Sequence, residues 1–399
     1  MSASTDDPRA TALPDPAAIL GGRSRLPAVG TTIFSVMSAL AVKHGAINLG
    51  QGFPDFDCDP ALIDAVDAAM RAGHNQYPPM PGVPALRQAI ATKVARQSGH
   101  AYDPDTEITV TAGATQGILT TVLALVHPGD EVVVIEPCYD SYAPAIELAG
   151  GRVRRVALTA GTWRPDFDAL AAAITPATRL VIVNTPHNPS GTAWTTAERD
   201  RFAEILRPTR ALVLSDEVYE HMVFDDQPHA GMATSPELAA RSVVVSSFGK
   251  TFHVTGWKVG FVAAPAPLMA EFRKVHQFNV FTVNAPMQHA IAAYLADPSH
   301  HEGLAAFYQR KRDRFREGLA RTRLRLLPCE GTYFQCVDYG AVSDMGDAAF
   351  SQWLTTDVGV AAIPMSAFYA EPPDMRVVRF CFAKREDTLD EALRRLASL

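Results

Sequence analysis

One lysine in this sequence is surrounded by residues that could hold a phosphorylated aldehyde. Lys250 follows an apolar segment, 242–246, in a turn that contains Gly249, and Lys258 follows shortly after. The amine of Lys250 could bond covalently to an aldehyde carbon. Ser247 and Lys258 offer a hydroxyl and a second cation for a phosphate. A lone lysine is usually a solvated surface charge, so this interpretation depends on what else reaches the same place.

Five apolar segments have the composition of buried strands and would position that lysine. They cover residues 108–111, 131–135, 180–184, 211–215 and 242–246, with amphipathic stretches between several of them. This alternation predicts a mostly parallel sheet covered by helices on both faces. Such sheets bind ligands at the carboxyl ends of their strands. The residues that follow each segment are therefore the candidates for a site.

The first two segments are followed by a possible anion site and an aromatic ring. Ala114 and Thr115 open a predicted helix that runs toward Val126, and amides at a helix N-terminus attract phosphate. Most Gly-Ala-Thr turns are only turns, so this signal is weak alone. Tyr139 follows the second segment and could stack on a flat heterocycle, although a tyrosine of the core or rim is the commoner case.

The third and fourth segments are followed by polar groups that suit a pyridine ring. Asn188 lies in a loop with two prolines and could bond a phenolic oxygen, or could form an Asx-turn instead. Asp216 ends an apolar strand, where a carboxylate is costly unless it is paired. A protonated ring nitrogen would be such a partner; a helix N-cap is the alternative. Tyr219, three residues on, could face the oxygen of the same ring.

Taken together, the five segment ends supply an anion cradle, a stacking ring, an oxygen partner, a partner for a ring nitrogen and an amine. Their joint occurrence in one order is far less probable by accident than any single piece. The cofactor that this set describes is pyridoxal 5'-phosphate.

The chain resembles the class I aminotransferases of the aspartate aminotransferase fold, most closely the branch of bacterial methionine aminotransferases and kynurenine/glutamine transaminases. Besides the lysine segment, the resemblance rests on Leu49-Gly-Gln-Gly-Phe-Pro-Asp-Phe56, Asn75-Gln-Tyr77, Asn184-Thr-Pro-His-Asn-Pro189 and Arg379-Phe-Cys-Phe-Ala-Lys384. It runs from Pro27 to the C-terminus. It implies an α/β protein of the pyridoxal-phosphate-dependent transferase fold type I, with a mostly parallel sheet covered by helices in a large domain, 57–295, and a smaller α+β domain, 296–399. A segment, 27–56, would pack with the small domain and the site, after an arm, 1–26, expected to be mobile.

The resemblance also implies a role for each candidate residue. Lys250 would hold the cofactor and act as the base that moves the substrate's α-proton, and Asp216 would pair with the ring nitrogen. The other cofactor contacts would be Tyr219 and Asn188 at the phenolic oxygen, Tyr139 on the ring, and Ala114, Thr115, Ser247, Lys258 and Tyr77 at the phosphate. Tyr77 would come from a second subunit, which implies a homodimer with shared active sites.

For the substrate, the resemblance implies that Arg379 holds the α-carboxylate, with the Gly52 backbone and Asn188. Arginine suits a bidentate carboxylate contact. Arg379 lies in an apolar run where an unpaired charge is expensive, and a structural ion pair is the alternative. Phe34, Phe281 and Tyr139 would be apolar walls, while Thr115 and Thr282 stand where relatives carry larger groups.

Near the expected pocket, the sequence offers no further arginine that could bind a second carboxylate of the substrate. This disfavours aspartate and predicts methionine, aromatic amino acids or glutamine as donors, with 2-oxo acids as acceptors in a ping-pong cycle. Two other functions remain open: a carbon–sulfur β-lyase that uses nearly the same residues, and a cofactor-binding regulator. A nicotinamide enzyme is disfavoured because no GxGxxG follows the first segment.

Composition limits the partners and the compartment. The 399 residues carry a net charge of −7, which argues against a nucleic acid or an anionic membrane. The densest basic run, 310–314, is predicted to be the exposed face of a helix. The five cysteines have no CxxC spacing and are expected to be buried free thiols, and the 12 histidines show no metal-binding spacing. Without a long apolar stretch or a signal peptide, the protein is expected in the cytoplasm.

Overall fold

The computed structural model describes residues 20–399. The chain divides into two compact units, residues 1–30 and residues 31–399. Most of the predicted N-terminal arm, residues 1–19, lies outside the described residues. Every element and contact given below belongs to residues 31–399.

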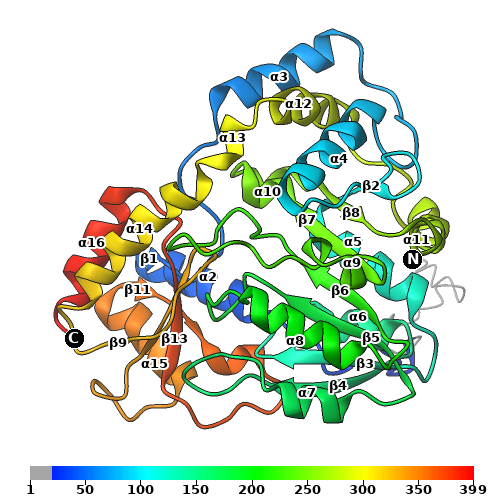
Figure 1. The fold of residues 1–399 in the computed structure, drawn as a ribbon. Coiled ribbons are helices and arrows are strands. Elements are labelled where there is room, and N and C mark those ends of the chain that lie inside the picture. The colour runs from blue at the N-terminus through cyan, green and yellow to red at the C-terminus, as the bar shows by residue number, and fades with distance from the viewer. Residues whose placement is uncertain (1–19) are drawn as a thin grey trace, which may run out of the picture. The chain divides into compact units, whose positions relative to one another are not determined.

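A seven-stranded sheet forms the centre of this unit (Figure 1). Its strand order is β2 (Ile108–Thr111), β8 (Gly260–Ala263), β7 (Ser242–Ser247), β6 (Leu212–Asp216), β5 (Thr178–Asn184), β3 (Glu131–Glu136) and β4 (Arg152–Ala157). Strand β8 runs antiparallel to both of its neighbours, and the other adjacent pairs are parallel. The five predicted segments are β2, β3, β5, β6 and β7, which confirms the mostly parallel sheet.

Helices cover both faces of the sheet, and the pattern of the central strands explains why. Successive side chains of a strand point to opposite faces. Val132 and Val134 of β3 accordingly pack in the cluster with α5 (Gly113–Leu125), α6 (Tyr142–Leu148) and α11 (Ala266–Asn279). Val133 and Ile135 pack in the opposite cluster with α7 (Phe167–Ala173), α8 (Thr196–Leu206) and α9 (Pro236–Ala239). Burial on both sides makes the strand continuously apolar.

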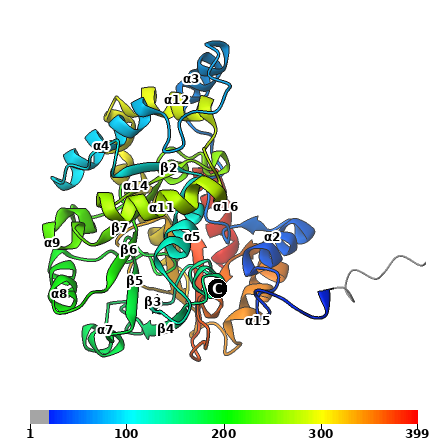
Figure 2. The same cartoon turned by 90° about the vertical axis from the view of Figure 1, so that its right-hand side faces the viewer.

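A third cluster joins the β2 edge of the sheet to α3 (Pro60–Arg71), α4 (Pro84–Ser98) and α12 (Ala285–Leu295). The two views of Figures 1 and 2 show these three helices side by side. Both α3 and α4 begin with proline, whose missing N–H costs nothing at a helix N-terminus.

A smaller mixed region completes the unit. Its four-stranded antiparallel sheet has the order β12 (Ile363–Pro364), β13 (Val377–Cys381), β10 (Phe334–Asp338) and β9 (Arg325–Leu326). It packs with α14 (Leu304–Leu319), α15 (Asp347–Trp353) and α16 (Glu386–Leu396). A parallel pair, β1 (Ile47–Asn48) and β11 (Val360–Ala361), lies beside α2 (Ile33–His44). The remaining short elements are η1 (Met232–Thr234), α10 (Phe248–Thr251), η2 (Thr255–Trp257), α13 (Ser299–Glu302), the π-helix η3 (Leu354–Val358) and η4 (Met365–Phe368).

The predicted α/β class with a second, smaller α+β region is confirmed, whereas the domain boundaries remain a prediction. All five cysteines are free; four are buried and Cys58 is half-buried. Among residues 20–399, none of the helices has the length and apolar composition that a membrane crossing needs.

The prediction for the basic run 310–314 is wrong at two positions. In α14, Lys311 and Arg312 are buried. Lys311 Nζ donates to the carbonyl of Lys384 at 2.8 Å, and Arg312 pairs with Asp225 at 2.6 Å. Five consecutive residues span more than one turn of an α-helix, so such a run cannot lie on one face.

Candidate active site

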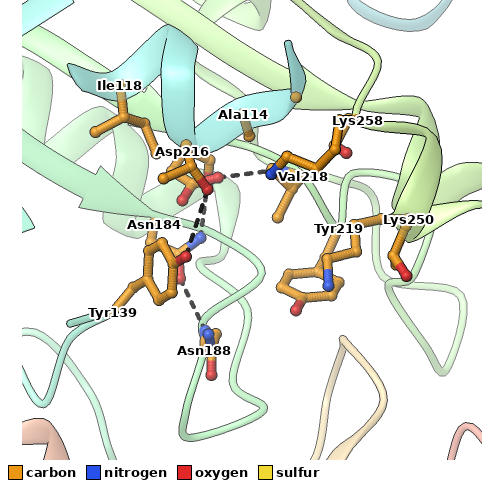
Figure 3. A pocket seen from close by; sticks show the side chains of 14 residues that line it. Ala114, Ile118, Tyr139, Asn184, Asn188, Asp216, Val218, Tyr219, Lys250 and Lys258 are labelled. Atoms are coloured by element: carbon orange, nitrogen blue, oxygen red, sulfur yellow. Dashed lines mark hydrogen bonds between the residues drawn. The ribbon is translucent and has the colours of Figure 1, made fainter. Parts of the chain in front are cut away.

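A cavity of about 200 Å³ lies at the carboxyl ends of the parallel strands. Nine of the predicted site residues line it: Ala114, Thr115, Tyr139, Asn188, Asp216, Tyr219, Ser247, Lys250 and Lys258. The other lining residues are Gly113, Ile118, Asn184, Val218 and Thr255. Figure 3 shows this arrangement, in which segments that follow β2, β3, β5, β6 and β7 meet. The strand-end rule used on the sequence therefore identified one real cavity.

Lys250 reaches this cavity from α10, the short helix directly after β7. Its Nζ donates to the Gly52 carbonyl at 3.1 Å and to the Tyr333 hydroxyl at 2.8 Å. No carboxylate of residues 20–399 lies within ion-pair distance of this amine. Burial lowers the pKa of Lys250 to about 8. A substantial neutral fraction is therefore present near pH 8, as a proton-accepting amine requires.

Gly52 packs so closely against Phe334 that there is no room for a side chain. A Cβ at this position would lie 2.9 Å from Cζ of Phe334, too close for any other residue without displacement of that ring.

Asp216 ends β6 and is 4% exposed. Its Oδ2 accepts a hydrogen bond from the Tyr142 hydroxyl at 2.7 Å, and its Oδ1 accepts one from the amide of Val218 at 3.3 Å. No cationic side chain within the described part of the chain forms an ion pair with it. Burial raises its pKa to about 6. The carboxylate is thus buried without a countercharge, and a protonated ring nitrogen would relieve that cost.

The N-cap alternative for Asp216 is wrong. The residues after β6 form a turn instead of a helix, and the bond to the Val218 amide is local to that turn.

Two asparagines connect Asp216 to the substrate end of the site. Asn184 Nδ2 donates to the backbone carbonyl of Asp216 at 2.8 Å, and its Oδ1 accepts from the amide of Asn188 at 2.8 Å. The side-chain oxygen of Asn188 in turn accepts from Arg379 Nη1 at 2.5 Å. Its Nδ2 donates to no group of residues 20–399, so it is available for the phenolic oxygen that the sequence predicted as its partner.

The opposite end of the cavity has the features of a phosphate site. Gly113 begins α5 with a positive φ of 73°, and the first amides of that helix lie at the cavity. A Cβ on Gly113 would lie 3.4 Å from Lys258 Nζ, which places this exposed ammonium beside the helix N-terminus. Thr115 Oγ1 lies 3.4 Å from the hydroxyl of Tyr139. A dianion would here meet helix amides, a hydroxyl from Ser247 and a cation.

Arg379 lies on β13 and is only 1% exposed. Its Nη2 donates to the Gly50 carbonyl at 3.2 Å. Its guanidinium carbon lies 3.9 Å from the ring centroid of Phe334, and the rings of Phe368 and Phe34 follow at 4.9 and 5.5 Å. No acidic group in the described chain lies within 4.0 Å of it, so the structural ion pair considered from the sequence is wrong. A buried guanidinium without an acid is prepared for an anionic ligand.

Tyr77 and Phe281 do not reach the cavity within one chain. Tyr77 is 83% exposed, and its ring packs edge-on against Phe281 with centroids 5.5 Å apart. Thr282 also lies outside the cavity lining. The roles inferred for these residues remain predictions, as does the role of the Gly52 backbone toward the carboxylate.

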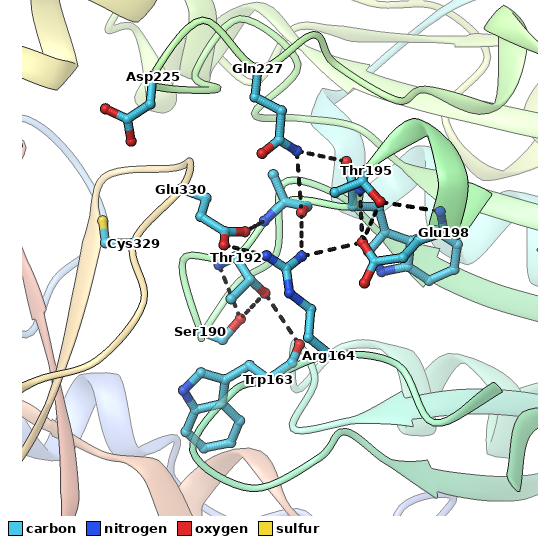
Figure 4. Close-up of polar contacts among 12 residues, drawn as sticks. Trp163, Arg164, Ser190, Thr192, Thr195, Glu198, Asp225, Gln227, Cys329 and Glu330 are labelled. Carbon is cyan, nitrogen blue, oxygen red and sulfur yellow. Dashed lines mark hydrogen bonds and ion pairs between the residues drawn. The ribbon is translucent and has the colours of Figure 1, made fainter. Parts of the chain in front are cut away.

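A polar network fixes the loop that carries Asn188 (Figure 4). Arg164 pairs with Glu198 at 3.2 Å and also with Glu330, and it donates to the carbonyl of Ala193 at 3.0 Å. The carbonyl of Gly191 accepts from the amides of residues 330 and 331, both at 2.8 Å. This network joins the loop after β5 to the segment that leads into β10.

Reasoning from sequence missed several residues that touch the predicted ones. Tyr142 follows Tyr139 by three residues, but it begins α6 whereas Tyr139 lies in the loop before that helix, so their spacing gave no helical signal. Asn184 was visible as the polar end of β5. Gly50 lies within the quoted motif 49–56, but nothing in the sequence connected it to Arg379, and Tyr333 gave no local signal; each meets its partner only through the tertiary fold.

With this geometry established, comparisons with known proteins identify the family. The family described as aminotransferase class I and II matches residues 44–396. The methionine aminotransferase of Escherichia coli is 52% identical over 378 residues, covering 94% of this chain and 98% of the relative. A kynurenine–oxoglutarate transaminase of Dictyostelium discoideum is 34% identical over 403 residues, covering 91% and 93%. The solved N-succinyldiaminopimelate aminotransferase of Mycobacterium tuberculosis superposes with a TM-score of 0.91 at 44% identity, covering 94% and 99%. The chain belongs to the class I and II aminotransferases.

Proposed function

We propose that this aminotransferase uses pyridoxal 5'-phosphate to move the amino group of methionine, an aromatic amino acid or glutamine to a 2-oxo acid in a ping-pong cycle. The proposal rests on three groups of one site. They are the half-buried amine of Lys250, whose pKa is lowered, the buried carboxylate of Asp216, which lacks a countercharge, and the buried guanidinium of Arg379, which lacks an acid and contacts the cavity through Asn188.

The residues of the chain would divide the work of binding and proton transfer. When bound, pyridoxal 5'-phosphate supplies a protonated ring that takes up the electron pair left at the substrate's α-carbon. Asp216 would stabilise the charge on the ring nitrogen. Arg379 would hold the α-carboxylate through two parallel N–H bonds. Lys250 Nζ, whose pKa desolvation lowers to about 8, would accept the α-proton in its neutral form.

The surroundings of Arg379 support an apolar donor. Three phenyl rings, those of Phe34, Phe334 and Phe368, flank its guanidinium. No arginine lines the cavity, and Arg379 is the only arginine of residues 20–399 that donates a hydrogen bond to a residue lining it, so the described chain presents no evident partner for a second carboxylate. The similarity to a methionine aminotransferase agrees with this choice. An N-succinyldiaminopimelate donor, the substrate class of another relative, carries an additional acid group and is disfavoured.

The substrate proposal is tested by kcat/KM for methionine, phenylalanine, glutamine, aspartate and N-succinyldiaminopimelate with one common 2-oxo acid. The kcat/KM for methionine and for phenylalanine should exceed that for aspartate. Lys250→Ala should be inactive with every donor. A preference for aspartate or N-succinyldiaminopimelate would contradict the donor assignment. Release of pyruvate and ammonia from a cysteine conjugate without a 2-oxo acid, faster than transamination, would support the β-lyase instead.

We further propose a homodimer in which Tyr77 completes the phosphate site of the second copy and Phe281 accompanies it as a wall. Both side chains are exposed, and Phe278 nearby on α11 is 87% exposed. Large exposed aromatic groups favour burial against another protein surface.

A hybrid experiment separates action within one chain from action between chains. Lys250→Ala and Tyr77→Ala subunits are coexpressed with different tags, and the hybrid dimer is isolated. If Tyr77 acts across the interface, one of the two sites in the hybrid is wild-type, and the hybrid recovers about half of the wild-type activity. If Tyr77 acts within its own chain, both sites carry a defect, and this recovery is absent.

A further inference from the structure

Tyr333 lies directly against the catalytic amine, although it belongs to the segment before β10. Its side chain is fully buried. Its hydroxyl accepts a hydrogen bond from Lys250 Nζ at 2.8 Å and donates one to the Gly52 carbonyl at 2.6 Å. The same carbonyl accepts from Lys250 Nζ at 3.1 Å. Amine, hydroxyl and carbonyl thus form a closed triangle of hydrogen bonds.

We propose that Tyr333 is a positioning residue for Lys250, whose hydroxyl, with the Gly52 carbonyl, holds the amine in the orientation from which it accepts the substrate's α-proton. This inference rests on the proposed function, because it assigns a step of that reaction to Lys250.

The count of donors and acceptors supports this role. A neutral amine has two N–H donors and one lone pair. One N–H is directed to Gly52 and the other to Tyr333, so the lone pair is left for a proton. The Tyr333 hydroxyl can serve as acceptor here because its own proton is directed to Gly52. Without Tyr333 the amine would keep one partner and could rotate about its last carbon–carbon bond.

The burial of Tyr333 indicates that it positions Lys250 and does not itself act as the base. Burial raises the pKa of this phenol well above its usual value. The hydroxyl therefore stays protonated across the working pH range and cannot itself be the base.

The ring of Tyr333 is held from several sides. Its centroid lies 4.9 Å from that of Phe334, 5.2 Å from that of Tyr219 and 5.6 Å from that of Tyr308. The backbone carbonyl of Tyr333 accepts from the amide of Phe382 at 2.9 Å. The segment before it is fixed to the carbonyl of Gly191 as described above. A hydroxyl on so rigid a support can fix the orientation of a flexible lysine.

The test compares Tyr333→Phe with Tyr308→Phe. Each change removes one buried hydroxyl, and the hydroxyl of Tyr308 has no hydrogen-bond partner in residues 20–399. In the cofactor-free protein, the pH dependence of Lys250 methylation by formaldehyde and a borohydride is followed by mass spectrometry of its peptide. An acceptor stabilises an ammonium more than an amine, so Tyr333→Phe should lower the pKa of Lys250 by roughly half a unit or more. Tyr308→Phe should leave it unchanged.

In the loaded enzyme, single turnovers use methionine with hydrogen or deuterium at the α-carbon. Tyr333→Phe should slow proton transfer about tenfold or more, since a misoriented base raises that barrier, and should raise the isotope effect with KM within about twofold. The inference would be overturned if Tyr333→Phe showed wild-type rates and an unshifted pKa of Lys250. It would also be overturned if Tyr333→Phe and Tyr308→Phe slowed proton transfer equally. If Lys250→Ala remains active, the proposed function itself fails; if it is inactive while Tyr333→Phe behaves as wild type, only this inference fails.

Discussion

Replacement of Asp216 by asparagine should reveal the cost of a buried carboxylate in the cofactor-free protein. Burial raises the pKa of this group from 3.8 to about 6. A shift of roughly two units corresponds to about 3 kcal/mol between the protonation states. The folded chain holds this proton more tightly than the unfolded chain does. The penalty is therefore absent below about pH 3.8 and complete above about pH 6.

The expected result is a difference that depends on pH. As pH rises from about 4 to about 7, the unfolding free energy of the wild-type apoprotein should fall by about 2–3 kcal/mol relative to Asp216→Asn. Effects of the substitution that do not depend on pH, such as altered bonds to Tyr142 and Val218, cancel in this comparison. With the cofactor bound, the wild-type protein should instead gain stability relative to Asp216→Asn at neutral pH. The protonated ring nitrogen supplies the missing countercharge to the carboxylate but not to the amide.

Urea unfolding of both proteins at pH 4, 5, 6, 7 and 8, with and without pyridoxal 5'-phosphate, measures these differences. Asp64→Asn on α3 is the control, since Asp64 is exposed and pairs with no group of residues 20–399. A gap between wild type and Asp216→Asn that is the same at pH 4 and pH 8 would refute the reasoning. So would equal cofactor affinity of the two proteins.

Three further outcomes follow from the site. In the apoprotein, the reaction of Lys250 with amine reagents should titrate near pH 8, because burial lowers its pKa to about 8; a midpoint near 10 would show that the amine is solvated. Arg379→Lys should lower kcat/KM for methionine by about 10²-fold or more, through the loss of a bidentate contact of roughly 3 kcal/mol, and a change below threefold would contradict the carboxylate assignment. Gly191→Ala should lower Tm by several degrees and kcat with it, since Gly191 has a φ of 76° and a Cβ there would lie 2.7 Å from the Phe334 carbonyl; an unchanged Tm would show that the loop relaxes freely.

The strands that carry the site were predictable because of how they are buried. Parallel strands covered on both faces must be apolar along their whole length, so β3, β5, β6 and β7 stand out from composition alone. Polar residues at their ends were then conspicuous, and Asp216 is the clearest case. Strand β4 was not predicted because it is an edge strand with three exposed arginines, Arg152, Arg154 and Arg155, which interrupt the apolar pattern. Strand β8 was not predicted because it follows the lysine segment directly.

The contacts that complete the site were not predictable from the sequence. Gly52, Lys250 and Tyr333 lie far apart along the chain, and a tyrosine before a strand is ordinarily a core residue. Lys311 shows the same limit. A run of charged residues predicts an exposed surface, and the sequence does not reveal that the carbonyl of Lys384 accepts a hydrogen bond from this buried amine.

The segment 49–56 depends on residues close to the opposite end of the chain. Lys384 Nζ donates to the carbonyl of Phe53 at 2.8 Å, the amide of Arg385 donates to Asp55 at 2.6 Å, and the hydroxyl of Thr388 donates to the same carboxylate at 2.7 Å. The carbonyls of Gly50 and Gly52, which accept from Arg379 and Lys250, thus lie in a segment that is anchored by residues far away in the sequence, and local unfolding of 384–388 would release both carbonyls together.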